Sequence, residues 1–195
     1  MKKLLFFLFI ITIGLFLYGC QQNITEPKHT DEENKDTGEG KKMDQKNIYD
    51  FKHIDKAPEA TEKQAMDKVI KVFFDESTFD KPYEAVAIDI ENNEVYANPI
   101  IGRRGLRAQD GIVKVNETAK VLDILDNHEV QTWDKKYSSD ANAYEDGYSW
   151  QLLLQYEDGT VEKYEGNEED EVPTDFNKLA KELRDFADEK IEENE

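Results

Sequence analysis

The sequence has little of the chemistry on which most active sites depend. It contains one cysteine, Cys20, and three histidines. A single cysteine excludes an internal disulfide, and the scattered histidines lack the spacing of a metal-ligand set. The serines are scattered, and none of them forms a recognisable nucleophile–base pair. The sequence therefore predicts no catalytic residue, no metal site and no cofactor, and it favours a binding protein over an enzyme.

Arginine is also scarce, because the chain has four arginines against 44 acidic residues and a net charge of −19. Such an excess of acid disfavours nucleic-acid backbones as partners, since their recognition relies on basic side chains. Three of the four arginines, Arg103, Arg104 and Arg107, lie in one segment, 101–111. Guanidinium groups bind carboxylates and phosphates through paired hydrogen bonds. The segment is thus a candidate site for an anionic ligand or an acidic partner; the alternative is that its arginines pair with carboxylates of their own domain.

Long hydrophobic runs are absent beyond residue 18. Lys2 and Lys3 precede the apolar stretch Leu4–Tyr18, which Thr12 and Gly14 interrupt. A membrane-spanning helix needs about 20 apolar residues, so this stretch is too short to cross a bilayer. A basic start followed by a short apolar segment is typical of a secretory signal peptide.

The end of this stretch, with Leu17, Gly19 and Cys20 around Tyr18, resembles the lipobox of bacterial lipoproteins. The resemblance implies that residues 1–19 are removed and that Cys20 becomes a diacylglyceryl-modified N-terminus. It also implies a protein anchored by lipid to the extracytoplasmic face of the cell membrane. The alternatives are an ordinary signal peptide with an incidental cysteine, or an uncleaved anchor.

Residues 20–57 are expected to form the lipidated end and a polar tether. The segment has almost no apolar residue before Ile48, and so it buries too little surface to offset the entropy of ordering. We interpret it as disordered. The alternative for 48–57 is an arm that docks on the domain through Ile48, Tyr49, Phe51 and Ile54.

Residues 58–191 are predicted to form one domain, followed by an acidic tail at 192–195. Apolar periodicity and turn residues predict the elements in chain order: a helix over 62–75 with a capping box at Thr61 and Gln64, strands near 84–91 and 94–98 joined by a two-residue turn at Asn92 and Asn93, a strand at 112–115, a helix over 117–126, a strand at 129–133, a hairpin of 150–156 with 160–164, and a last helix beginning after Asp175.

The register of the 150–164 hairpin has two solutions. A two-residue loop places Val161 opposite Tyr156, whereas a three-residue loop with a bulge at Gly159 places Thr160 there. The mixed order of helices and hairpins predicts an α+β fold, with an antiparallel sheet of about five or six strands and about three helices on one face.

The stretch from Trp150 through Asp158 and Gly159 to Pro173 and the last helix is similar to small uncharacterised bacterial lipoproteins, a resemblance that implies no activity. The sequence as a whole predicts a cell-surface lipoprotein that acts as a binding or interaction module. An envelope enzyme with a dispersed active site is the alternative.

Overall fold

The fold is seen in a computed structural model, which describes residues 48–78, 83–138 and 147–194. Its centre is a seven-stranded sheet with the order β6-β3-β2-β1-β8-β9-β7. The strands are β1 (Val69–Ser77), β2 (Glu84–Asp89), β3 (Glu94–Tyr96), β6 (Ile112–Lys114), β7 (Lys136–Tyr137), β8 (Ser149–Tyr156) and β9 (Val161–Gly166). All neighbours are antiparallel except β7 and β9, which are parallel. The predicted α+β class is confirmed, and the sheet has more strands than the five or six expected.

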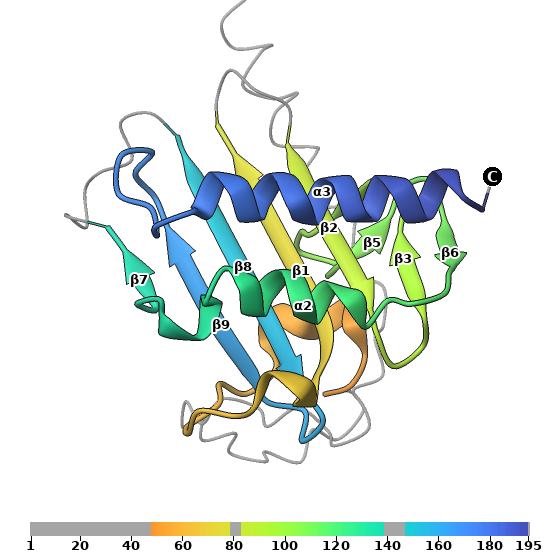
Figure 1. Cartoon of the computed structure of the whole chain (residues 1–195), viewed down its shortest axis with the longest axis horizontal. Helices are drawn as coiled ribbons and strands as arrows, with labels where there is room; N and C mark the ends of the chain where they lie inside the picture. The colour runs from red at the N-terminus through yellow and green to blue at the C-terminus, as the bar shows by residue number, and fades with distance from the viewer. Residues whose placement is uncertain (1–47, 79–82, 139–146, 195) are drawn as a thin grey trace, which may run out of the picture. The chain divides into compact units, whose positions relative to one another are not determined.

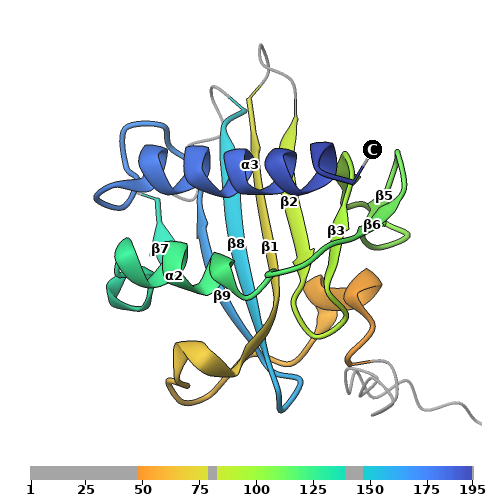
Figure 2. The ribbon, with the colours of Figure 1, turned by 45° about the vertical axis from the view of Figure 1, so that its right-hand side comes forward.

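Two α-helices, α2 (Lys120–Asn127) and α3 (Phe176–Glu192), lie across one face of this sheet (Figure 1). The view in Figure 2 keeps both helices on the same side of the strands. A separate ribbon pairs β4 (Pro99–Ile100) with β5 (Arg107–Ala108). The short 3-10 helices are η2 (Phe51–Lys56), η3 (Met66–Lys68) and η4 (Val130–Thr132). None of the helices in the described residues is long and apolar enough to cross a membrane.

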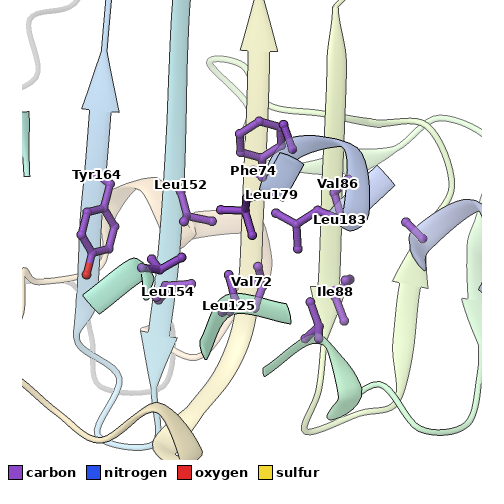
Figure 3. Packing of buried hydrophobic residues seen from close by; sticks show 14 of the residues in the cluster. Val72, Phe74, Val86, Ile88, Leu125, Leu152, Leu154, Tyr164, Leu179 and Leu183 are labelled. Atoms are coloured by element: carbon purple, nitrogen blue, oxygen red, sulfur yellow. The ribbon is translucent and has the colours of Figure 1, made fainter. Parts of the chain in front are cut away.

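The main core lies between the sheet and the two α-helices. It is built from alternate residues of the central strands and from the inner stripes of the helices (Figure 3): Val72, Phe74, Val86, Ile88, Leu152 and Leu154 from the strands, and Leu125, Leu179 and Leu183 from the helices. Alternation follows from the strand's two-residue period, which sends these side chains to one face. Full burial of such a side chain stabilises the fold by about 1.5–3 kcal/mol.

A second, smaller core lies on the opposite face of the sheet. There Phe73, Leu153 and Val161 pack against Phe51 and Ile54 of η2, which are 3% and 1% exposed. Residues 48–57 were considered either as part of the disordered tether or as an arm that docks on the domain. In the structure they dock on the domain. We call residues 48–57 the arm.

The helix predicted over 62–75 is wrong, because most of this range belongs to strand β1 and the short η3. β1 is a central strand with both faces buried, so its apolar residues run continuously and also satisfy helical spacing. The β-branched and aromatic residues of Val69–Phe74 favour the strand. Gln64 does not cap a helix; its side-chain amide donates to Asp158 Oδ2 and Thr160 Oγ1, both at 2.9 Å.

The strand predicted at 129–133 is also wrong, because this segment contains η4. Glu129 has a φ of 49°, and this left-handed conformation ends the extended geometry that a strand needs. The turn expected at Asn92 and Asn93 is longer than two residues, since Asp89 pairs with Glu94 and four residues connect them.

The 150–164 hairpin is confirmed, and the structure selects one register. Gln155 pairs with Val161, and the Tyr156 N–H donates to the Thr160 carbonyl at 2.9 Å. Thr160 therefore lies opposite Tyr156, as the three-residue loop requires. Gly159 adopts a φ of +83°, which supplies the left-handed residue of that loop.

Candidate functional site

The three clustered arginines lie on a loop that the rest of the domain holds in place. We call residues 99–108, from β4 to β5, the arginine loop. Ile100 pairs with Arg107 at its base. At its tip the Gly105 N–H donates to the Gly102 carbonyl at 2.7 Å, which closes a four-residue turn with Arg103 and Arg104 at its centre. Both arginines therefore project from a defined turn.

The arm holds the arginine loop in place through Gly105 and Leu106. Leu106 is 2% exposed in the second core, and its N–H donates to the Lys52 carbonyl at 2.9 Å. Gly105 has a φ of +85°, and an added Cβ there would lie 2.1 Å from the Lys52 oxygen. Only glycine allows this close approach of the two backbones.

The arginine side chains themselves are exposed. Within the described residues, Arg103, Arg104 and Arg107 make no ion pair and no side-chain hydrogen bond. Asp110, the nearest acid along the chain, instead accepts a hydrogen bond from Asn98. The alternative from the sequence was that these arginines pair with carboxylates of their own domain. No such pair is present among the described residues.

The fourth arginine is used in a different way. Arg184 of α3 forms an ion pair with Glu76, and its Nε lies 2.8 Å from Glu84 Oε2. Its guanidinium carbon also lies 5.4 Å from the centre of the Phe74 ring. Arg184 thus links α3 to β1 and β2, whereas the three arginines of the arginine loop have no ion pair among the described residues.

A second polar feature lies on the sheet face away from α2 and α3. Asp75 of β1, Gln151 of β8, Glu165 of β9 and Lys136 of β7 are successive cross-strand partners. We call these four residues the polar row. They line a cavity of about 360 Å³, whose other walls include Tyr137, Ser149, Trp150 and Asn167.

Asp75 is the most buried charged group of the polar row, with 7% of its surface exposed. Its Oδ2 accepts hydrogen bonds from Gln151 Nε2 at 2.9 Å and from the Tyr83 hydroxyl at 3.0 Å. Burial raises the pKa of Asp75, and the two hydrogen bonds together with the charge of Lys163 offset this only in part. Burial and the Asp75 charge likewise raise the pKa of Tyr83.

The remaining charges of the row are balanced. Glu165 lies 2.5 Å from Lys163 Nζ and 3.6 Å from Lys136 Nζ. By contrast, no lysine or arginine of the described residues lies within ion-pair distance of Asp75. Asp75 is therefore the carboxylate of the cavity without an ion pair among the described residues, and only the more distant charge of Lys163 acts on it.

Two further polar atoms of the cavity walls are buried without a hydrogen-bond partner in the part of the chain that the structure describes. One is the amide oxygen of Asn167, and the other is the indole nitrogen of Trp150. The indole nitrogen lies against the backbone of Gly166, where an added Cβ would be 2.3 Å away. Asn167 therefore offers the acceptor that a ligand could use.

The sequence indicated the arginine loop but missed the polar row. The arginines are neighbours along the chain, whereas the four residues of the polar row come from four different strands. In addition, the helix predicted over 62–75 included Asp75, so the sequence did not place Asp75 in a sheet. Cys20, the predicted lipidation site, lies outside the described residues. Over residues 48–78, 83–138 and 147–194, no group of three or more acidic, histidine or cysteine side chains is arranged to hold a metal ion.

Comparison with known proteins adds no family to this description. No protein-family model, no curated protein and no solved structure matches the chain. The arginine loop and the polar row are thus the features from which a function can be argued.

Proposed function

We propose that the chain is a lipid-anchored binding protein of the extracytoplasmic membrane face, and that the arginine loop is its binding site. The partner is a molecule or protein surface that presents carboxylate or phosphate groups. The observation that carries this proposal is the set of three exposed arginines without ion pairs in the described part of a chain with a net charge of −19. The anchor is supported by Leu17, Gly19 and Cys20.

The charge of the domain makes the loop selective. Acidic residues repel an anionic partner from most of the surface, while the loop attracts it, so the encounter is directed to one place. Each guanidinium can donate two parallel hydrogen bonds to one carboxylate or phosphate.

The scaffold of the loop favours binding as well. Leu106 and Gly105 hold the loop against the arm in the absence of a partner. A preorganised loop loses little conformational entropy when it binds, and more of the interaction energy remains as affinity. The exposed arginine side chains still lose rotamer freedom, and paired hydrogen bonds offset that loss.

The test uses a triple variant, R103A/R104A/R107A, of the detergent-extracted protein. Immobilised poly-L-glutamate and immobilised phosphate serve as the two probes, at low and at high salt. We expect the wild type to bind at least one probe and to be released by salt, and the variant to lose this binding. Its unfolding free energy should change by less than about 0.5 kcal/mol, since the arginines are exposed surface residues.

A charge-matched control is available on the opposite side of the sheet. K120A/K178A/K181A removes three exposed lysines that already pair with Glu117, Asp175 and Asp185 of the helix face. This control should bind as the wild type does. Equal loss in both triple variants would mean that net charge alone governs retention, and unchanged binding in the arginine variant would refute the site.

A further inference from the structure

The cavity over the polar row has the properties of a small-molecule site independent of the arginine loop. Its volume of about 360 Å³ is within the range of ligand pockets. It lies beside the second core. Asp75 is two positions after Phe73 on β1, and Gln151 is two positions before Leu153 on β8, so both face the same side of the sheet as that core. The arm fills the apolar part of this face, and the polar part borders the cavity.

The charge of the cavity determines what it can bind. Glu165 is compensated by Lys163 and Lys136. Among the described residues, the direct partners of Asp75 are the neutral donors Gln151 and Tyr83, and Lys163, whose charge also acts on Asp75, already pairs with Glu165. A buried carboxylate without a cation carries a desolvation penalty that neutral hydrogen bonds offset in part. A ligand with one positive charge supplies the missing counter-ion.

The unpartnered acceptor in the wall narrows the ligand class. The amide oxygen of Asn167 is buried without a partner in the described residues, and an ammonium group has three N–H donors. Such a group can donate to Asp75 and to Asn167.

We infer that this cavity binds a small primary amine, with the Asp75 carboxylate as its counter-ion and the Asn167 amide oxygen as a second acceptor. The inference does not depend on the arginine loop, because the two sites have opposite charge and share no residue. The cavity would also let the domain bind a cationic ligand, which the positively charged arginine loop repels.

The first test needs no variant. The intrinsic fluorescence of the purified protein reports on the cavity, because Trp150 lines it and Trp133 lies 6.3 Å from Trp150 between ring centroids. Butylamine, butyrate and 1-butanol are titrated as probes of equal chain length. We expect a saturable change with butylamine alone. The absence of saturation, or an equal response to butanol or butyrate, would overturn the inference.

The second test removes the charge and keeps the shape. Asp75→Asn retains an acceptor for Gln151 and Tyr83 and should weaken butylamine binding by about tenfold or more, the loss expected for a charge-assisted hydrogen bond. Asp123→Asn removes an exposed carboxylate of α2 and should bind butylamine as the wild type does. Wild-type affinity in Asp75→Asn would refute the assignment. If Asp75→Asn does not fold, the comparison of the three probes on the wild type decides.

Discussion

The backbone N–H of Leu106 donates a hydrogen bond of 2.9 Å to the carbonyl of Lys52. This bond joins the arginine loop to the arm, two segments that are far apart in the sequence. Both ends lie beside the second core, where Leu106 packs with Phe51 and Ile54. The position of the candidate binding loop therefore depends on residues that the composition of the chain assigned to a tether.

Gly105→Ala should disrupt this junction. The new Cβ would lie 2.1 Å from the Lys52 oxygen, and the φ of +85° disfavours any residue with a side chain. We expect a loss of about 1–3 kcal/mol in the free energy of unfolding, measured in urea. Gly102→Ala is the control, because a Cβ there meets nothing within 4 Å. Equal stability of the two variants would contradict the described contact.

Phe51→Ala tests whether the arm belongs to the folded domain. Phe51 is 3% exposed and its ring lies 5.1 Å from that of Tyr96 in an edge-to-face arrangement. Removal of a buried aromatic side chain should cost about 3–5 kcal/mol. Lys56→Ala, at an exposed position of the same short helix, should have little effect. Wild-type stability of Phe51→Ala would show that the arm does not contribute to the fold.

Glu162 should give the domain a specific acid sensitivity. Its Oε2 accepts hydrogen bonds from Tyr156 at 2.6 Å and Tyr164 at 3.0 Å, and Lys135 lies 2.6 Å from Oε1. Burial alone raises the pKa of Glu162, but Lys135 and the two tyrosines outweigh burial, and the pKa is lowered. A carboxylate with a lowered pKa in the folded state stabilises the protein above its unfolded pKa, and this stabilisation is lost as the pH falls through the folded value.

The variant Glu162→Gln isolates this contribution. It should be less stable than the wild type at pH 7 by about 1–3 kcal/mol, the range for charge-assisted hydrogen bonds to a buried group. The difference between the two proteins should shrink as the pH is lowered below the unfolded pKa of glutamate. Urea unfolding over a pH series measures it, and a difference that does not vary with pH would exclude the proposed role of the charge.

Cys20→Ala tests the anchor. If Cys20 carries the lipid, the variant should be found in the soluble fraction or as an unprocessed precursor. Fractionation of cells followed by immunoblotting distinguishes the two. Intact-mass analysis of the wild type should show a diacylglyceryl modification, and an unmodified Cys20 in a membrane-bound protein would eliminate the anchor.

The sequence predicted those elements whose two faces have different surroundings. The last helix presents Leu179 and Leu183 to the core and charged residues to solvent, so its period is visible. In β1 the contrast fails, because Phe73 and Phe74 are both buried, one in each core. A strand enclosed on both sides has no alternating pattern by which to recognise it.

The candidate sites show the same limit. Arg103 and Arg104 are adjacent in the chain, so their clustering is a property of the sequence. The contact of Gly105 with Lys52 and the alignment of Asp75 with Gln151 depend on long-range pairing, which no local pattern encodes. The polar row therefore becomes visible only when the register of the strands is known.

The attachment of the arm, and of the residues directly after it, to the sheet also has a mechanical consequence. Val161 of β9 donates its N–H to the Pro58 carbonyl, and the Ala60 N–H donates to the Val161 carbonyl, in a parallel bridge between Glu59 and Val161. For a protein held at Cys20, a pull on the domain enters through the arm before it reaches the sheet. The first load would fall on the arm's contacts with Leu106 and Gln155. If Cys20 carries the anchor, tension on it would act first on the hydrogen bond between Lys52 and Leu106, which positions the arginine loop. Such tension would change the affinity of the loop for a partner while the sheet remains intact.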